Sequence, residues 1–482
     1  MKAQSSAPGP RGRSLLRTIL GRRSDPIALL VELKAEYGDI VEVRLGDMRQ
    51  FLVSDPEAAR HVLVQNHENY SRGPGHVLLR GLLGEGLVTS EGDHWRSHRK
   101  IIQPLLARER LSAFVPVMVE SAAQEAAALG ELARKGLTVD VFKRMNALTL
   151  SIAARTLLGS DVTHREAEVH RSVSTVLDHM ERLRTSAWRY LELLPGARPL
   201  RWIRGATATL PTPSRKSFNE AIATLDDVIY EVIARRREFD HGATEATDLV
   251  ALLRAASCSG NGPPFTDEDV RDEIMTMFIA GYETTSTALT WCLYLLARHP
   301  DHQLRIAREA DAVLGGRPPT LTDLPDLVAS RKFVDEALRL YPPVWRIGRH
   351  AVGHDRIGGY HIPPGSVVTI LPYLLHRDPT HWPDPERFDP DRFDPGESRD
   401  RVRGAYLPFG AGQRMCPGSS FATAEIQIIL ATVCRGVAFE LEPGFEPAFA
   451  PRVTLRPKGG MPLRLVPPAS MATSTSSLTR TR

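Results

Sequence analysis

Long helical segments dominate the first half of the chain, and short alternating runs flank them. From about residue 56 to 247 the sequence is rich in Ala, Leu, Glu and Arg with few strand-like runs, which predicts helices. Residues 40–45 instead alternate between apolar and polar, Gly46-Asp47 is a turn signal, and residues 51–53 are apolar. A β-hairpin is therefore expected at this point.

One long helix is expected near the middle of the chain, after the helical region of residues 56–247. Thr266 is followed by Asp267 and Glu268, a pattern typical of an N-cap with acidic residues in the first turn. The helix runs to about Arg298, where His299-Pro300 ends it.

The remaining pattern predicts short elements. Residues 334–340 form a helix that two prolines stop, and residues 358–369 alternate as a second hairpin. Residues 377–395, crowded with Pro and Asp, indicate an irregular meander. A helix follows Cys416, and short strands close the chain. The fold class is mainly α with a small, discontinuous β region.

Two irregular segments interrupt the helices. Residues 73–86 contain five glycines, and residues 195–213 contain four prolines among arginines. Irregular segments between helices are where lids over substrate sites tend to lie.

No linker is visible between residues 28 and 466, so we expect one domain with a flexible arm (1–27) and a disordered tail (467–482). No apolar run near the start is long enough to span a bilayer or to act as a secretory signal, so no membrane anchor is expected. Residues 15–20 are apolar but short and edged by arginines, which fits either a weak membrane-surface contact or a solvated arm.

Composition excludes only a few classes of function and says little about the cellular compartment. The net charge of +4 is nearly balanced and gives no sign of nucleic-acid binding. The four cysteines form no C-x-x-C pair, so neither a zinc site nor a disulfide framework is expected from them. This usage suits a reducing cytosol, and we expect a cytoplasmic protein.

Cys416 lies in the most informative run, residues 409–418. We place Pro417 at the first helical position, where the free N–H groups and the helix dipole favour an anionic sulfur. Arg414 is placed to pair with an acidic group. The flanking glycines, which let a large flat cofactor approach the backbone, are Gly410, Gly412 and Gly418. A buried, inert cysteine is the alternative.

This run resembles the haem-binding signature of the cytochrome P450 family, and the resemblance covers roughly residues 28–466. It implies a mostly helical triangular prism with haem b held between the long central helix and the cysteine loop. Cys416 would be the axial thiolate ligand, which favours O–O cleavage. The resemblance assigns cofactor contacts to Trp95, Arg99, Ala280, Gly281, Arg349, Phe409, Gly410, Arg414, Cys416 and Gly418.

The central helix carries residues 280–285, Ala-Gly-Tyr-Glu-Thr-Thr, which resemble the family's motif of small residue, Gly, any residue, acid and Thr. Gly costs about 1 kcal/mol relative to Ala in a helix, so the sequence accepts a local cost there. By resemblance, Glu283 and Thr284 would be catalytic and organise a water chain that delivers protons during O–O cleavage. The alternative is a close helix crossing with a back-bonded threonine.

Glu336 and Arg339 form an i,i+3 pair that resembles the family's E-x-x-R helix. The alternative is an exposed salt bridge that contributes little to stability, because its sequence pattern is the same. By resemblance the pair is structural and locks to an arginine of the meander. Spacing favours Arg392, with Arg387 as the alternative.

Trp95 and Arg99 lie at i,i+4 on one helix face, where a propionate-bearing ligand would meet an indole N–H and a guanidinium. A solvated basic face is the alternative. By resemblance they bind the haem propionates together with Arg349 and Arg414.

Substrate-facing residues follow from family position alone. They are Phe278, Val344, Trp345, Arg346 and Val453, with residues 73–88 completing the wall. Arg346 is unusual for such a wall. It either orients an acidic or carbonyl-bearing substrate, points outward, or joins the propionate cations.

The implied reaction inserts one atom of dioxygen into a hydrophobic molecule such as a terpenoid, polyketide or fatty-acyl compound of bacterial secondary metabolism. No flavin or iron–sulfur segment is visible, so electrons from NAD(P)H would arrive through a ferredoxin reductase and a ferredoxin. Basic residues that could dock an acidic ferredoxin are Arg96, Lys100, Arg108 and Arg435. An oxidative coupling enzyme or isomerase on the same fold, or a non-catalytic haem or ligand carrier, remains open.

Overall fold

The computed structural model describes residues 6–12, 14–15, 25–45, 48–73, 77–159, 164–185, 213–239, 249–258 and 265–468. Its α-helices are α2 (Pro26–Tyr37), α3 (Pro56–Arg60), α4 (Val77–Leu83), α5 (Gly92–Leu105), α6 (Val115–Arg134), α7 (Val141–Leu157), α8 (Glu166–Thr185), α11 (Pro213–Phe239), α12 (Leu249–Cys258), α13 (Asp267–Arg298), α14 (Pro300–Leu314), α15 (Val328–Leu340), α16 (Pro372–Leu375), α17 (Pro395–Ser398) and α18 (Ser419–Val433).

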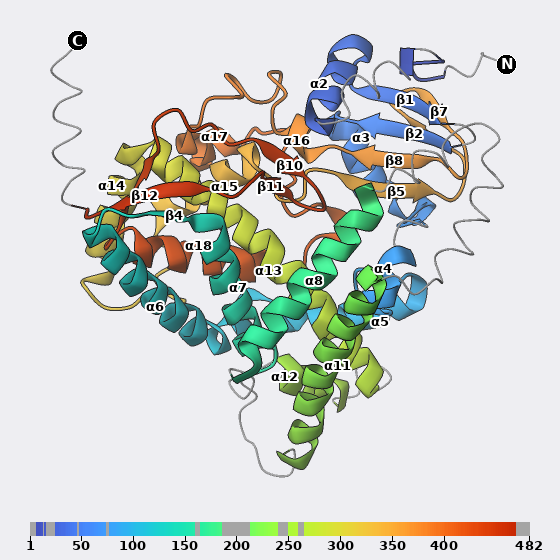
Figure 1. Ribbon diagram of the computed structural model, residues 1–482. Coiled ribbons are helices and arrows are strands. Elements are labelled where there is room, and N and C mark those ends of the chain that lie inside the picture. Colours follow the sequence, from blue (N-terminus) through green and yellow to red (C-terminus); the bar gives the residue numbers. More distant parts are fainter. Residues whose placement is uncertain are drawn as a thin grey trace, which may run out of the picture.

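Short 3-10 and π-helical turns connect several of these helices, namely η1 (His61–Gln65), η2 (His67–Asn69), η4 (Arg108–Ala113), η6 (Pro390–Phe393) and η7 (Gly412–Arg414). The strands are β1 (Ile40–Leu45), β2 (Met48–Val53), β3 (Tyr70–Ser71), β4 (Thr138–Asp140), β5 (Ile347–Ala351), β6 (Asp355–Ile357), β7 (Tyr360–Ile362), β8 (Val367–Ile370), β9 (Ala438–Leu441), β10 (Phe449–Pro451), β11 (Leu455–Pro457) and β12 (Pro462–Val466). The mainly helical fold with a small β region is confirmed (Figure 1).

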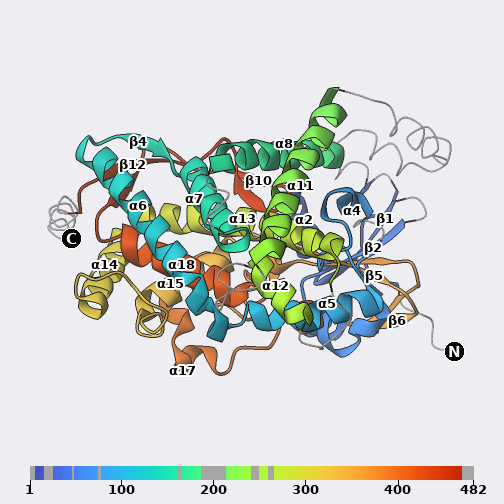
Figure 2. The ribbon, with the colours of Figure 1, turned by 90° about the horizontal axis from the view of Figure 1, so that it is seen from below.

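Helix α13 is the central element. Its 32 residues span about 48 Å. Thr266 caps it as predicted, because its hydroxyl accepts from the Asp269 N–H while the Asp269 carboxylate accepts from the Thr266 N–H. The helix packs against α7, α11, α12, α15 and α18 and runs through the middle of the molecule (Figure 2).

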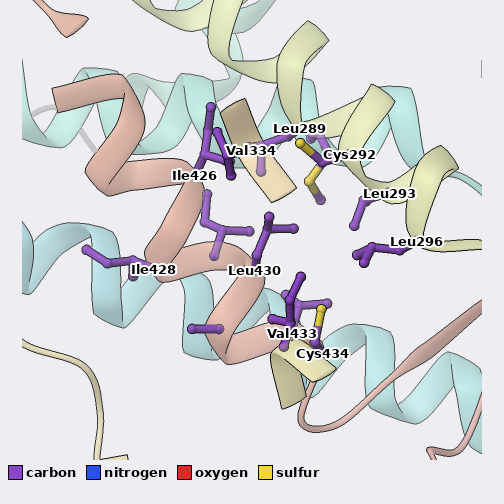
Figure 3. Packing of buried hydrophobic residues seen from close by; sticks show 14 of the residues in the cluster. Leu289, Cys292, Leu293, Leu296, Val334, Ile426, Ile428, Leu430, Val433 and Cys434 are labelled. Atoms are coloured by element: carbon purple, nitrogen blue, oxygen red, sulfur yellow. The ribbon is translucent and has the colours of Figure 1, made fainter. Parts of the chain in front are cut away.

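The C-terminal half of α13 belongs to the largest apolar core, which it shares with α6, α7, α15 and α18. Figure 3 shows Leu289 and Leu293 of α13 meeting side chains of α15 and α18. Fully burying each such side chain contributes about 1.5–3 kcal/mol. This packing fixes α18, and therefore the cysteine loop that precedes it, relative to α13.

The N-terminal half of α13 belongs to a second core with α5, α7, α8, α11 and α12. This core carries α5, the helix of Trp95 and Arg99, against the same central helix. The two cores therefore hold both the cysteine loop and α5 against the same helix, α13.

The main sheet has the strand order β1-β2-β8-β5-β3. Strands β1 and β2 form the predicted hairpin, with Ile40 opposite Val53. Strand β8 joins β2 in parallel and β5 antiparallel, so residues near 50 and near 370 lie side by side. A smaller sheet has the order β4-β12-β9.

The expected hairpin over residues 358–369 is wrong. Residues Tyr360–Ile362 instead pair backward with Asp355–Ile357. The turn is Gly358-Gly359, and both glycines have positive φ (54° and 86°), which suits a two-residue hairpin turn. The later residues form β8, which goes to the main sheet because its partners there bury Val368 and Ile370 completely.

Two further expectations need correction. Residues 77–83, placed in a glycine-rich loop, form helix α4, because burial of Leu82 and Leu83 offsets the local cost of Gly81. Part of the expected N-terminal arm lies against β1, since the Glu42 N–H donates to the Pro8 carbonyl at 2.8 Å and Ala7 is buried. The predicted lid at 195–212 and the tail from 469 lie outside the described residues.

Among the helices of the described ranges, none combines the length and the apolar character needed to cross a bilayer.

Candidate functional site

The cysteine loop is held by backbone bonds and by two glycines. The Cys416 N–H donates to the Phe409 carbonyl at 2.9 Å, which closes the loop. Gly410 and Gly412 have φ of 72° and 71°, the left-handed region that glycine tolerates. A Cβ at Gly412 would lie 2.0 Å from the Leu63 carbonyl oxygen, so the loop packs directly on η1.

The helix after the loop starts later than predicted. Gly418 is the N-cap of α18 and Ser419 its first residue, so Pro417 precedes the helix and does not open it. Burial raises the pKa of the Cys416 thiol, while a hydrogen bond from the Gly418 N–H and the charge of Arg99 act in the opposite direction. The N–H of the cap residue Gly418 thus reaches the sulfur, as the sequence argument required, although the helix starts two residues later than predicted.

Helix α13 leaves a gap on one side at its middle. Ala280 and Gly281 are exposed although most residues around them are buried. A Cβ added to Gly281 would meet nothing within 4 Å. An exposed patch in the middle of a buried helix means that open space borders the helix there, as a bound ligand requires.

Thr284 and Glu283 point to different partners. The Thr284 hydroxyl donates to the Ala280 carbonyl at 2.7 Å, so the back-bonded alternative describes its conformation. The Glu283 carboxylate is buried and accepts from the Thr454 hydroxyl at 2.7 Å and from Arg456 at 2.8 Å. The predicted acid and alcohol are therefore adjacent in sequence but have different partners. Glu283 contacts residues near the C-terminal strands, whereas Thr284 bonds to its own helix.

Four arginines gather near the loop, and we call Arg72, Arg99, Arg349 and Arg414 the arginine cluster. Burial lowers the pKa of Arg72 to about 9, with further lowering from the charges of the other three. Burial also lowers the pKa of Arg414 to about 10 and lowers the pKa of Arg99 and of Arg349. Within the described residues, Glu91 is the carboxylate whose charge opposes this lowering at Arg72, Arg349 and Arg414.

Trp95 packs against one member of the cluster, Arg414. The Arg414 guanidinium carbon lies 3.8 Å from the centre of its buried indole ring, a cation–π contact. Arg414 also donates to the carbonyls of Leu87 and Ser90. The structure thus brings together all four residues predicted to contact propionates, and it adds Arg72, which sequence reasoning missed.

A family model described as Cytochrome P450 matches residues 7–462. The chain belongs to the cytochrome P450 family. It is 34% identical over 459 residues to cyclooctatin synthase of Streptomyces melanosporofaciens, covering 95% of this chain and 94% of that protein. It is 30% identical over 419 residues to pentalenene oxygenase of Streptomyces avermitilis, covering 87% and 88%.

The same fold is found in solved structures. The haem domain of cytochrome P450DA superposes with a TM-score of 0.81 at 24% identity, covering 96% of this chain and 98% of that one. The protein is a cytochrome P450 monooxygenase. Members of the family bind haem through a cysteine thiolate.

The described residues fit such a group. Among the described residues, Glu91 is the carboxylate whose charge opposes the lowered pKa of Arg72, Arg349 and Arg414, and two haem propionates would add two negative charges beside these cations. The open side of α13 at Ala280 and Gly281 gives a flat ring room beside the helix. The half-buried Cys416 sulfur is a soft donor suited to iron.

The Glu336–Arg339 pair of this P450 is buried and contacts the meander. The buried Arg339 donates twice to Glu336, at 2.6 and 2.8 Å, and also to the carbonyls of His376, Pro385 and Arg387. Arg392 lies 3.5 Å from Glu336, whereas the Arg387 side chain turns outward to Asp389. Arg392 is thus the meander arginine nearer the pair.

The residues of the expected substrate wall differ in their exposure. Val344 (37%) and Val453 (53%) are exposed apolar residues. Trp345 is buried in an apolar core and donates to the Arg452 carbonyl at 3.1 Å, so the structure does not place it on an open wall. Phe278 is buried and lines a small apolar pocket between α8, α11 and α13.

Arg346 is exposed and lies with its guanidinium carbon 4.8 Å from the Trp345 ring centre. Of the expected docking residues, Lys100 and Arg108 are exposed, and Arg96 pairs with Asp93 at 2.6 Å. Arg435 pairs with Asp311 and follows the end of α18, about 22 Å along the helix axis from its start. It does not lie beside the cysteine loop.

Proposed function

We propose that this P450 is a haem-thiolate monooxygenase that hydroxylates or epoxidises a terpenoid, with Cys416 as the axial ligand of haem b. The observation that carries the proposal is the cysteine loop, in which the Cys416 sulfur receives the Gly418 N–H and lies in the field of the Arg99 charge. The terpenoid class is supported by the relatives, because one is named cyclooctat-9-en-7-ol 5-monooxygenase and another pentalenene oxygenase. Both belong to Streptomyces species, which fits bacterial secondary metabolism.

When bound, the haem supplies activation of dioxygen and oxidation of the substrate. The arginine cluster holds its propionates, and the Trp95 ring keeps the Arg414 guanidinium in place for them. Gly410, Gly418 and Phe409 would line the loop next to the haem, whereas Gly412 packs the loop on Leu63.

Proton handling is assigned to Thr284 and Glu283. The Thr284 hydroxyl is the polar group beside the open side of α13, so it holds and passes the proton at its Oγ1. Glu283 reaches the same space only by leaving Thr454 and Arg456. The carboxylate can therefore relay protons to Thr284 only when that contact breaks.

Substrate contacts are assigned to the exposed Val344 and Val453, with Phe278 behind them. Arg346 remains a candidate for orienting an oxygen-bearing substrate because its head is exposed.

Electrons come from NAD(P)H through a ferredoxin reductase and a ferredoxin. We place the docking surface at Arg96, Lys100 and Arg108, on α5 and the turn after it. Charge reversal at Lys100 and Arg108 should slow reduction and flatten its salt dependence. Unchanged rates and salt dependence would remove this surface from the proposal.

Replacing Cys416 by Ala tests the central assignment. The reduced carbonyl complex should lose its thiolate-type absorption, while the matched variant Cys434→Ala, at the far end of the same helix, should keep it. Survival of the spectrum in Cys416→Ala would refute the ligand.

The reaction class is tested separately, by turnover of a panel of cyclic terpenoids under labelled dioxygen with surrogate ferredoxin and reductase. One labelled oxygen atom per product is expected. Turnover without label would indicate coupling or isomerisation instead, and absence of all turnover across the panel would count against a terpenoid oxygenase.

A further inference from the structure

Three metal-ligating side chains meet where α5 packs beside the start of α13. His94 and His98 lie one turn apart on α5, with ring centres 4.0 Å from each other. Asp269 lies in the first turn of α13. One ligand atom from each of the three residues lies within 4.8 Å of the others. This group plays no part in the haem site described above.

The separation of two of these atoms is informative. His98 Nε2 lies 3.6 Å from Asp269 Oδ1, which is longer than a hydrogen bond. Two ligands bound to one Zn²⁺ at about 2.0–2.2 Å and at a tetrahedral angle lie about 3.4 Å apart. The pair is thus spaced as ligands of one ion are.

The outer partners orient both imidazoles for metal binding. His98 Nδ1 lies 2.8 Å from the carboxylate of the fully buried Glu273. His94 Nε2 lies 3.1 Å from the Glu85 carbonyl, which can only accept, so this nitrogen carries the proton. With these nitrogens engaged by the outer partners, His98 Nε2 and His94 Nδ1 are the nitrogens left to bind a metal ion. A histidine whose second nitrogen donates to a carboxylate or a carbonyl is typical of zinc ligands.

The rest of the surroundings also holds the three groups in place. The Asp269 Oδ2 atom accepts from Thr266 in the capping box, which leaves Oδ1 for another partner. The Phe265 ring stacks on His98 with ring centres 4.3 Å apart. His94 is exposed, so an ion can enter from solvent, while His98 is buried.

We propose that His94, His98 and Asp269 bind one Zn²⁺ ion, with water as the fourth ligand. Two imidazoles and one carboxylate are a common zinc donor set. The ion would tie α5 to the first turn of α13 and so hold the helix that carries Trp95 and Arg99.

The test is a calorimetric titration of the full-length, haem-loaded protein with ZnCl₂ after chelator treatment. One ion per chain is expected, and His94→Ala and Asp269→Asn should each weaken binding at least tenfold. His94 is exposed and asparagine matches the shape of aspartate, so both variants should fold. His354→Ala is the matched control, because His354 is an exposed histidine paired with His361 elsewhere, on the β6–β7 hairpin.

Loss of binding in both site variants with retention in the control supports the proposal. Absence of stoichiometric binding to the wild-type protein would overturn it. Binding that both site variants retain, or that only His354→Ala removes, would overturn it as well.

Discussion

Replacing Arg456 by Met should destabilise this P450 by about 3 kcal/mol at pH 7. The Glu283 side chain is 5% exposed and that of Arg456 is 18% exposed, with 2.8 Å between their charged atoms. Removing one partner of a buried ion pair costs about 3–5 kcal/mol, because an uncompensated charge remains. We expect the lower end of this range, since Thr454 still donates to Glu283 and the Arg456 head keeps some solvent contact.

The double variant Glu283→Gln/Arg456→Met provides the decisive comparison. It removes both charges, so its stability should lie within about 1 kcal/mol of wild type and thus about 2 kcal/mol above that of Arg456→Met alone. Arg464→Met is the matched control, because Arg464 is 54% exposed and 4.0 Å from Glu440. Loss of this exposed pair should cost less than about 1 kcal/mol.

The assay is guanidinium chloride unfolding of the haem-loaded proteins at pH 7, followed by tryptophan fluorescence at equal haem occupancy. The shift of the midpoint multiplied by the common slope gives the change in unfolding free energy. The reasoning is refuted if Arg456→Met unfolds like the Arg464→Met control. It is equally refuted if the double variant is no more stable than the single one.

Three further predictions follow from buried or clustered charges. Burial raises the pKa of Glu425 to about 8, and its Oε1 atom has no hydrogen-bond partner among the described residues. The folded protein therefore binds more protons at this residue than the unfolded chain does. As a result, the free energy of unfolding falls as pH rises from 4.5 to 8. Glu425→Gln should therefore gain up to about 3 kcal/mol over wild type at pH 7 and little at pH 4.5, measured by unfolding across that range, and a pH-independent difference would contradict this. Burial lowers the pKa of His376 to about 3, so stability falls as pH drops below 6.5, and this residue alone should cost about 2 kcal/mol at pH 5. His376→Gln should flatten that acid-side slope, and an unchanged slope would show that other groups cause it. Arg72→Gln should speed haem transfer to an excess haem acceptor about tenfold, as expected for one charged hydrogen bond, whereas the exposed control Arg356→Gln should not.

The sequence is most informative where one short run contains both the chemistry and its support. The cysteine loop, the Thr266 cap and the Glu336–Arg339 pair are such cases, because their partners lie a few residues away or in a recognisable motif. The position of the α18 start was wrong by two residues because a proline fits equally well just before a cap.

Most of the site features that the sequence did not predict depend on tertiary partners far along the chain. Arg72 joins the arginine cluster only because the chain folds back there, and no spacing in the sequence links it to Arg414. The direction of Glu283 depends on Thr454 and Arg456, some 170 residues later. The same limitation placed Trp345 on the substrate wall, since the apolar core in which it is buried includes residues from the distant N-terminal segment.

The pairing of β2 with β8 has a consequence for how the protein is made. Gln50 donates to Thr369 across this pair, and 319 positions of chain separate them. At a synthesis rate of about 5–20 residues per second, the β1–β2 hairpin waits roughly 16–64 s on the ribosome for its partner strand. During that interval Phe51 and Val53, fully buried in the finished sheet, stay uncovered next to an unpaired strand edge. The nascent N-terminal hairpin thus presents a surface that a chaperone would have to cover until β8 has been synthesised.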